Sequence, residues 1–492
     1  MSEIVVTAAY PFVPADLRIY HLASTYIPAD VQTRFLRAFG YDVEFVSGTD
    51  VHGVQARRYL ETQDADVESA LRACHRGYAD RLDFADVELD TYDMLFGQAF
   101  EDAVQRAYRS CDDSGLIRAD DTTVYRCTGC GYYLPNRFRR RAGAVDDEEP
   151  FDAEAPPAER LVCGFCDEQQ VVRASSRHSF LDLPASDAYD PVIRQQHRSD
   201  VRARLRSEAD DVERWDITRD DYFGVPHPDR GALSFYLWFG SLAGLPTLLD
   251  DGTVDRLRSR REVTFQHFMG KNLTYYHGIV LPVIADAGLG FRNTTFQLSP
   301  RGFVSESDGG LSLSDVPADH AEYLRYYVMT RLTDRMNDFV LRRSEFTEVT
   351  NNVVCDKLGG FFSRACTILA QQGVDTAPDP PESLRGLGEF IDRTEAMVSE
   401  ARTTAAVECV QSYFDHAHGL ISEGELYDDP DAADLRVLTA AVANGLALLA
   451  PVLPRRVATY NVFESWSPDH LPARVPSGTP LDHDTGRWEK IT

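Results

Sequence analysis

Lysine is scarce in this chain. Only three of the 492 residues are lysines, at positions 271, 357 and 490, and arginine supplies the rest of the 50 basic residues. Against 78 acidic residues, this leaves a formal net charge of −28. Because nucleic-acid phosphates are bound mainly by neutralising them, this balance argues against a large non-specific nucleic-acid footprint, although it is compatible with a local basic groove. It also leaves few positions for a catalytic lysine.

Long hydrophobic runs are absent as well. No run of about 18 apolar residues occurs, so we expect no membrane-spanning segment. The first residues, MSEIVVTAAYPF, lack the regions of a signal peptide. The nine cysteines include two CxxC pairs, which in an intracellular chain favour metal binding over disulfides. With 43% hydrophobic residues, the sequence predicts a cytoplasmic, well-cored globular protein.

The order of the apolar segments predicts an α/β fold. Residues 4–9 form a short apolar run, residues 22–39 have a helical pattern that Gly40 closes, and residues 41–47 alternate like a strand. This is a βαβ unit, which predicts a Rossmann-type parallel sheet. Ligands in such sheets bind at the carboxyl ends of the strands, here the loops after Ala9 and Ser47.

Changes in composition divide the chain into five expected segments. Residues 146–160 are acidic and rich in proline, which predicts a solvated loop. The expected segments are the first half of the sheet domain (1–115), an insertion that holds the cysteine pairs (116–230), the second half of the sheet domain (231–320), a stem and helical bundle (321–465), and an irregular tail (466–492).

The two cysteine pairs, Cys127-Thr-Gly-Cys130 and Cys163-Gly-Phe-Cys166, have the spacing of zinc-knuckle half-sites. Four thiolates complete a tetrahedron around Zn²⁺ and leave no open coordination position, so this zinc would be structural. The alternative is four ordinary buried thiols.

Several motifs occur in an order that resembles one family. They are AAYPFVPADLRIYHLASTYIPADVQTRFLRAFGYDVEFVSGTDVHG, YRCTGCGYYLPNRF, FYLWFGSLAG, FMGKNLTYYHGIVLP and NNVVCDKLGGFFSRA. Nearly the whole chain resembles the methionyl-tRNA synthetases, which are class I aminoacyl-tRNA synthetases. The resemblance implies a Rossmann-type catalytic domain, a zinc-bearing insertion, a stem and an α-helical anticodon-binding domain.

The ATP-binding motifs depart from the family pattern. Aligned with the HIGH-type motif, His21 is kept, Arg18 replaces the first histidine, and Tyr20 replaces the glycine on which adenine stacks. A tyrosine ring should fill that space, because pockets have little slack. We therefore expect ATP to bind weakly or not at all in the family's mode.

Two further motifs that the family uses to bind ATP are altered, one that supplies a cation and one that contacts the ribose. The KMSKS-type loop corresponds to residues 310–314, with Leu313 in place of a lysine, and the GKD motif ends in Asn272. Losing a preorganised cation typically costs orders of magnitude in rate. Arg18 and Arg301 are candidates to meet a phosphate instead; the alternative is that both are surface or salt-bridged arginines.

The resemblance implies an amino-acid pocket that is better preserved. Asp50 matches the carboxylate that holds the substrate ammonium, and Trp238 and His277 match the pocket aromatic and histidine. Tyr10 and Phe12 replace a leucine and a tyrosine. Ser241, Leu242 and Leu245 replace an alanine, a proline and a tyrosine. Methionine therefore need not be the ligand; the alternative for Trp238 and Phe12 is plain core packing.

The positions that contact tRNA in the family are altered too. Val353 and Lys357 stand at the anticodon helix's asparagine and arginine, and Gly419-Leu420 stands at a Pro-Trp whose tryptophan stacks on a base. Leucine cannot replace a stacking contact worth about 1–3 kcal/mol. We expect tRNA charging to be lost.

These observations leave three hypotheses. The first is an enzyme of specialised metabolism that binds an α-amino acid and passes its carboxyl group to a small-molecule acceptor, with a small partner enzyme by family analogy. The second is a catalytically inactive binding or scaffold subunit. The third is a methionine–tRNA ligase with atypical motifs.

Overall fold

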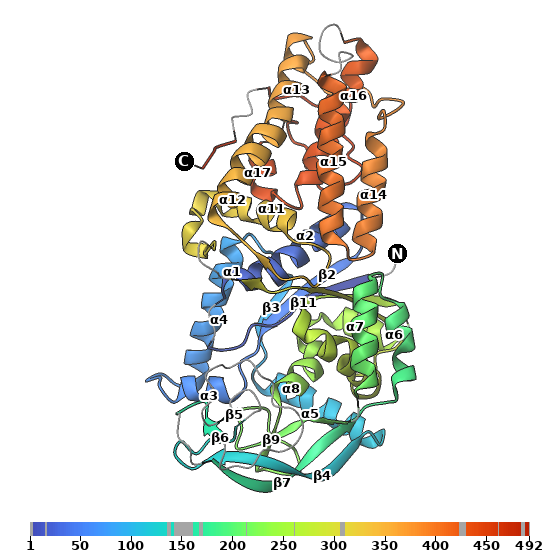
Figure 1. Cartoon of the computed structure of the whole chain (residues 1–492). Coiled ribbons are helices and arrows are strands. Elements are labelled where there is room, and N and C mark those ends of the chain that lie inside the picture. Colours follow the sequence, from blue (N-terminus) through green and yellow to red (C-terminus); the bar gives the residue numbers. More distant parts are fainter. Residues whose placement is uncertain are drawn as a thin grey trace.

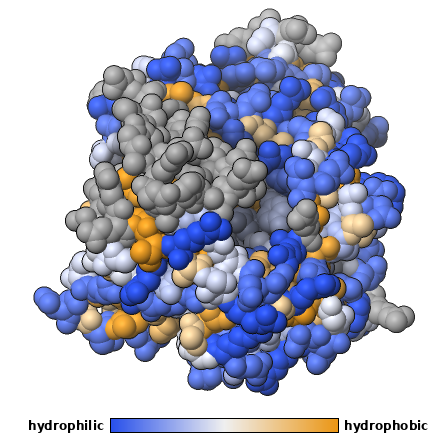
Figure 2. Space-filling model, turned by 60° about the horizontal axis from the view of Figure 1, so that its bottom comes forward, coloured by the Kyte–Doolittle hydropathy of each residue, from blue (hydrophilic) through white to orange (hydrophobic). Residues whose placement is uncertain are grey.

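A central parallel sheet separates a helical bundle from a lower layer of helices and an antiparallel insertion (Figure 1). This computed structural model describes residues 3–14, 17–134, 139–141, 161–166, 171–212, 214–259, 261–305, 310–422, 430–460, 462–483 and 488–491. The acidic stretch 146–160, expected to be a solvated loop, lies outside the described residues. Hydrophilic residues dominate the described surface in Figure 2, and hydrophobic ones form small groups.

All five strands of the sheet are parallel. They are β1 (Glu3–Ala8), β2 (Val43–Thr49), β3 (Thr91–Met94), β11 (Val263–Gly270) and β12 (Thr294–Arg301), in the spatial order β12-β11-β1-β2-β3. The first three strands extend from β1 to one side, and β11 and β12 extend to the other, so the strand order reverses between β1 and β11. In a doubly wound sheet the ligand is expected at the carboxyl ends of the strands at this point. The predicted Rossmann-type fold is confirmed.

The two faces of the sheet pack against different cores, because alternate side chains of a strand point to opposite faces. In β1, Ile4, Val6 and Ala8 join the core that continues into the helical bundle. Val5 joins the core beneath the sheet. The bundle is thus built onto one face of the sheet.

A broken helix follows β1. It consists of α1 (Ile19–His21), a π-helical turn (Leu22–Tyr26) and α2 (Ile27–Ala38), so it begins three residues before the predicted start at residue 22. A second π-helical turn, Tyr276–Val280, follows β11. Such turns contain one residue more than an α-helical turn and occur frequently at functional sites.

The remaining helices of the sheet domain flank these strands. They are α3 (Val54–Leu60), α4 (Val67–Phe84), α5 (Gln98–Asp113), α6 (Asp190–Arg194), α7 (Ser199–Asp210), α8 (Leu237–Ala243), α9 (Asp251–Arg258) and α10 (Leu281–Val283).

The insertion is a long hairpin with short additions. Its strands are β4 (Ile117–Cys127), β5 (Arg139–Arg141), β6 (Leu161–Cys163), β7 (Val171–Asp182), β8 (Arg214–Asp216), β9 (Thr218–Asp220) and β10 (Leu233–Phe235). An imidazole ties three of them together. Buried His178 of β7 lies 2.8 Å from Asp216 Oδ2 through Nδ1 and 2.9 Å from Asp220 Oδ2 through Nε2.

The C-terminal region is helical, as expected from the sequence. Two short strands, β13 (Val304–Ser305) and β14 (Phe339–Val340), pair beside its first helices. The helices are α11 (Ala321–Arg331), α12 (Arg343–Glu348), a π-helical segment (Val349–Gly359), α13 (Gly360–Gln371), α14 (Leu387–Ser399), α15 (Thr403–Ser422), α16 (Ala432–Leu449) and α17 (Pro454–Thr459).

Buried Arg325 of α11 joins this bundle to the sheet domain. Its guanidinium contacts the Asp30 carboxylate and donates to the carbonyls of Ala85, Asp86, Pro451 and Val452.

Within the described part of the chain, one helix has the length and composition to cross a membrane. This helix is α16, and 72% of it is buried inside the structure. Core helices share this length and composition, and α16 packs inside the fold as one of them.

Candidate functional site

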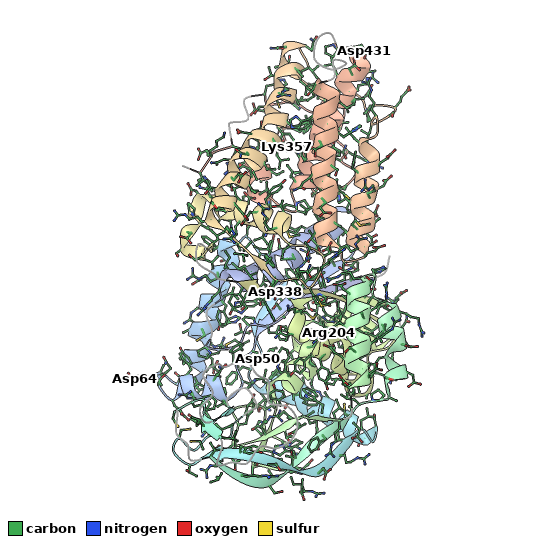
Figure 3. The ribbon with its side chains drawn as sticks, viewed as in Figure 1. Asp50, Asp64, Arg204, Asp338, Lys357 and Asp431 are labelled. Carbon is green, nitrogen blue, oxygen red and sulfur yellow. The ribbon has the colours of Figure 1, made fainter. Side chains whose placement is uncertain are left out.

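Asp50 lies directly after β2, below the sheet in the view of Figure 3. Its backbone N–H donates to the Pro11 carbonyl at 2.9 Å, and its carbonyl accepts from the Val13 N–H at 3.0 Å. These bonds join the loops that follow β1 and β2 and set Phe12 beside Asp50. The predicted pocket residues Tyr10, Phe12 and Asp50 are therefore brought to one edge of the sheet.

Two neutral groups contact the Asp50 carboxyl, which is only 3% exposed. Ser241 Oγ lies 2.6 Å from Oδ2, and the His52 backbone N–H donates to Oδ1 at 3.0 Å. The His52 ring is 3.7 Å from Oδ1, but burial lowers its pKa to about 4, so the ring is neutral at pH 7. No lysine or arginine in the described part of the chain forms an ion pair with Asp50. Burial, opposed by the two hydrogen bonds, raises the pKa of Asp50 to about 6.

Gly53 lets the insertion approach this edge. Its φ is +113°, its N–H donates to the Phe223 carbonyl at 2.8 Å, and a Cβ would lie 3.2 Å from the Tyr222 hydroxyl. Burial, with the nearby Tyr236 and Asp50, raises the pKa of Tyr222. Its buried hydroxyl lies near the Leu237 backbone. Sequence reasoning missed Tyr222, because it lies far along the chain and no local motif marks it.

Helix α8 supplies one wall of the site. Trp238 stacks on Tyr276 with 4.3 Å between ring centroids and 8° between planes. Ser241, one turn later on α8, reaches Asp50. Residues three apart lie on the same helix face, so Trp238 and Ser241 both face the carboxyl end of the sheet.

His277, the residue after Tyr276, is buried. Burial lowers its pKa to about 4, so the ring is neutral at pH 7. Neither ring nitrogen has a hydrogen-bond partner in the described part of the chain. Its ring centroid is 5.0 Å from that of His267, which bonds to Thr7 Oγ1 at 2.6 Å.

Tyr10 and Phe12 line the same edge. Tyr10 is half-buried, and burial together with the Asp50 charge raises the pKa of its hydroxyl, which therefore stays protonated. Phe12 is 36% exposed, so it is not plain core as one alternative held.

His21 ends α1 as a neutral hydrogen-bond donor. Burial and the nearby Arg18 charge lower its pKa to about 4. Its Nδ1 accepts from the Arg18 backbone N–H at 3.1 Å, so the ring proton is on Nε2. The half-buried Tyr20 ring lies 4.0 Å from the His21 ring, and the Arg18 side chain is exposed beside them.

Arg301 has a different environment. It is 0% exposed at the end of β12, and its guanidinium donates to Thr333 O and Thr404 Oγ1, both at 3.0 Å, and lies 3.2 Å from Asp334. This matches the salt-bridged alternative for Arg301. A phosphate-binding role for Arg301 stays a prediction that requires this pair to open.

The segment aligned with the KMSKS-type loop satisfies its own polar groups. Ser312 and Asp315 bond to each other, and Ser312 Oγ lies 2.8 Å from Ser314 Oγ. Asp315, directly after this segment, pairs with Arg343 at 3.5 Å. The loop thus presents a carboxylate and hydroxyls where the family has lysines.

Each of the three lysines is ion-paired with an aspartate. Lys271 lies 2.7 Å from Asp338, Lys357 lies 2.5 Å from Asp415, and Lys490 lies 2.6 Å from Asp356. Lys271, next to the altered Asn272, is the lysine closest in sequence to the ligand edge of the sheet.

The four predicted zinc ligands come together. The Sγ atoms of Cys127, Cys130, Cys163 and Cys166 all lie within 4.8 Å of one another. The Cys127–Cys166 and Cys130–Cys163 pairs are 3.6 and 3.7 Å apart. A tetrahedron with Zn–S bonds of about 2.3 Å has edges of about 3.8 Å, so this cluster has the size that Zn²⁺ requires. Bound there, zinc would fix the insertion and would take no part in catalysis.

A doubly wound sheet with a buried carboxylate at the carboxyl end of β2, a four-cysteine insertion and a helical bundle define a class I aminoacyl-tRNA synthetase fold. The family described as tRNA synthetases class I (M) matches residues 4–366, and the chain belongs to this family.

Individual relatives agree with this assignment. The chain is 25% identical to the methionine–tRNA ligase of Psychrobacter arcticus, over 94% of this chain and 73% of that protein. It is 26% identical to the methionine–tRNA ligase of Methanosphaerula palustris, over 84% of this chain and 66% of that protein.

A solved structure shows the same fold. Mycobacterium tuberculosis methionyl-tRNA synthetase in complex with methionyl-adenylate matches with a TM-score of 0.74 and 16% identity, covering 98% of each chain.

Proposed function

We propose that this chain binds an α-amino acid through Asp50 and transfers the amino acid's carboxyl group to a small-molecule acceptor instead of tRNA. The observation that carries the proposal is the buried Asp50 carboxyl, which has two neutral contacts and no ion-paired lysine or arginine among the described residues. A buried carboxylate without a cation is unfavourable unless a ligand supplies the charge. An ammonium group does so.

The aromatic and histidine residues beside Asp50 support an amino-acid side chain as the remainder of the ligand. Helix α8 carries Trp238, which stacks on Tyr276. The π-helical turn after β11 carries Tyr276 and the buried His277. The changes at Tyr10, Phe12, Ser241, Leu242 and Leu245 favour an amino acid other than methionine.

The changes in the family's ATP-binding motifs argue against ordinary ATP-dependent tRNA charging by this chain. The loop at 310–314 carries no lysine, and the Tyr20 ring lies tilted against the His21 ring where the family has glycine. His21 and the exposed Arg18 remain as groups that could contact phosphates. Activation would therefore depend on Arg18 and His21.

The helical bundle supports an acceptor other than tRNA. Lys357, at the position of the family's anticodon-helix arginine, is ion-paired with Asp415 (Figure 3 labels Lys357). Gly419 and Leu420 line a cavity of about 390 Å³ where the family has its stacking tryptophan. The net charge of −28 points the same way. The acceptor, a partner enzyme and a cytoplasmic site of action rest on family analogy.

A second candidate is a non-catalytic binding subunit. It is favoured by Arg301, which is buried against Asp334, and by the ion pairs of all three lysines. In this case the chain would bind an amino acid without activating it.

ATP–pyrophosphate exchange across the standard amino acids separates these functions. Wild type, Asp50→Asn and Asp64→Asn are compared, because Asp64 is exposed on a turn away from Asp50 (Figure 3). Exchange with one amino acid, lost in Asp50→Asn, kept in Asp64→Asn and not followed by tRNA charging, supports the proposal. Calorimetric binding without exchange supports the second candidate. Methionine-dependent tRNA charging contradicts both.

A further inference from the structure

The Ser241 hydroxyl lies between two oxygen atoms that both act as acceptors in their usual forms. Ser241 Oγ is 2.6 Å from Asp50 Oδ2 and 2.8 Å from the Leu237 carbonyl oxygen. A hydroxyl has one proton and can donate only one full hydrogen bond. The Leu237 carbonyl cannot donate. When the Ser241 proton is donated to Leu237, the proton between Ser241 Oγ and Asp50 Oδ2 must therefore come from the Asp50 carboxyl.

We infer that at mildly acidic pH Asp50 is protonated in the ligand-free protein, donating from Oδ2 to Ser241 Oγ while Ser241 donates to the Leu237 carbonyl, and that an amino-acid ammonium displaces this proton on binding. Ser241 is then a positioning residue that holds the ammonium anchor in a neutral, proton-loaded form. This inference rests on the proposed amino-acid site, and it adds the proton linkage and the role of Ser241.

The groups that face Asp50 are consistent with a neutral carboxyl. His52 is neutral near pH 7 and offers only its backbone N–H to Oδ1. The pKa values of Tyr10 and Tyr222 are raised, so both hydroxyls keep their protons. Arg219 lies over the Tyr236 ring at 4.1 Å and is ion-paired with Asp216 at 3.2 Å.

The binding step balances without any further reactant. The amino acid arrives with its ammonium group already protonated. Asp50 gives up the Oδ2 proton to solvent, Ser241 turns its own proton toward the carboxylate, and the ammonium pairs with the resulting charge. Well below pH 6, one proton is released for each ligand bound. When the ligand leaves, Asp50 takes up a proton again, and the hydrogen bonds from Asp50 to Ser241 and from Ser241 to Leu237 re-form.

Protein stability tests the protonation state without any ligand. Asparagine at position 50 reproduces the protonated acid: its amide NH₂ donates to Ser241 Oγ and its oxygen accepts from the His52 N–H. Since the pKa of Asp50 is raised from 3.8 to about 6, ionisation destabilises the folded wild type as the pH rises through this range, and the penalty is complete above it. Asp50→Asn avoids the penalty.

The expected result is a melting temperature for Asp50→Asn that rises relative to wild type between pH 4 and pH 7.5, by on the order of 5 °C. Asp64→Asn should show no such pH-dependent difference. If Asp50 instead stays ionised throughout this pH range, Asp50→Asn loses a charged acceptor and its melting temperature lies below that of wild type at every pH from 4 to 7.5. That sign would overturn the inference.

Infrared spectroscopy provides a second measurement on the free protein. The C=O stretch of a protonated carboxyl should be present at pH 5 in wild type and missing in Asp50→Asn. In Ser241→Ala the same band should move, because its hydrogen-bond acceptor is gone. A wild-type spectrum without this band at pH 5 also overturns the inference.

Calorimetry with the standard amino acids, methionine first, tests the linkage to the ligand. In buffers of different ionisation enthalpy, proton release should approach one per ligand at pH 5 and vanish above pH 7. Affinity should fall about tenfold for each pH unit below 6. Binding without proton release at pH 5 contradicts the linkage. If no amino acid binds at any pH, the proposed function fails, while the stability and infrared results still decide the protonation of Asp50.

Discussion

Replacing His178 by glutamine should remove a pH-dependent part of the insertion's stability. Burial opposes a charge on this ring, but the hydrogen bonds and charges of Asp216 and Asp220 outweigh it and raise its pKa from 6.5 to about 9. The ring is therefore an imidazolium at pH 7. Glutamine keeps one donor but supplies no charge, so the two carboxylates would face each other without a cation.

The size of the effect follows from the pKa. A value about 2.5 above the ordinary one, at about 1.4 kcal/mol for each unit, gives about 3 kcal/mol. Solvent reduces this figure, because the Asp216 and Asp220 side chains keep 26% and 17% of their exposure. Since the folded pKa lies above the unfolded one, the stabilisation is complete below pH 6.5, declines as the pH rises, and is gone above about 9.

Urea unfolding at pH 6, 7.5 and 9.5, followed by tryptophan fluorescence, measures this decline; Trp215 lies in β8 next to Asp216. Wild type should be the more stable at pH 6, and its curve should converge with that of His178→Gln by pH 9.5. His470→Gln serves as the control, because His470 is exposed in the tail. Parallel curves for wild type and His178→Gln across this range would show that the ring is not an imidazolium.

Three other predictions concern the metal, the nucleotide and the domain junction. Metal analysis of protein purified without chelator should find one zinc per chain, and Cys130→Ser should lose it and destabilise the insertion while the sheet domain stays folded; zinc-free wild type would contradict the site. Tyr20→Gly should raise ATP affinity without bringing adenylation to the rate of an ordinary synthetase, because Leu313 supplies no cation; micromolar ATP affinity in wild type would contradict this reasoning. Arg325→Met should lower stability by about 3 kcal/mol or more in urea unfolding, because it leaves the buried Asp30 with only the partly exposed Arg34 as its cation and removes the donor to four carbonyls. The half-exposed pair of Arg331 with Glu345 should contribute less than about 1 kcal/mol, so Arg331→Met is the matched control.

Features that depend on local spacing were predictable from the sequence. The alternation in residues 41–47 and the apolar run at 4–9 identified β2 and β1 to within two residues, because strand period and chain turns are local properties. The CxxC spacing likewise identified four thiols that the fold brings within 4.8 Å. Asp50 was identifiable because it directly follows a strand at the ligand edge.

Features that depend on contacts between distant segments were not predictable in the same way. The bond between Ser241 and Asp50 joins residues 191 positions apart, and sequence shows Ser241 only as a replacement for alanine. The environment of Arg301 depends on Asp334 and Thr404 from the bundle, so the sequence left open whether the guanidinium faces a ligand or an ion pair. Tyr222 reaches the site through the backbone contact of Phe223 with Gly53, for which no motif exists.

The two π-helical turns at the ligand edge constrain the length of the chain as well as its residues. Each turn, Leu22–Tyr26 and Tyr276–Val280, holds one residue more than regular α-helix would. Deleting one residue from the first turn would make the helix continuous and would rotate Arg18, Tyr20 and His21 by about 100° relative to α2, since an α-helix has 3.6 residues per turn. The same deletion in the second turn would carry Tyr276 and His277 away from Trp238. A single-residue deletion here would thus leave both helices folded and every side chain of the site present, yet dismantle the site by changing the phase of the helix.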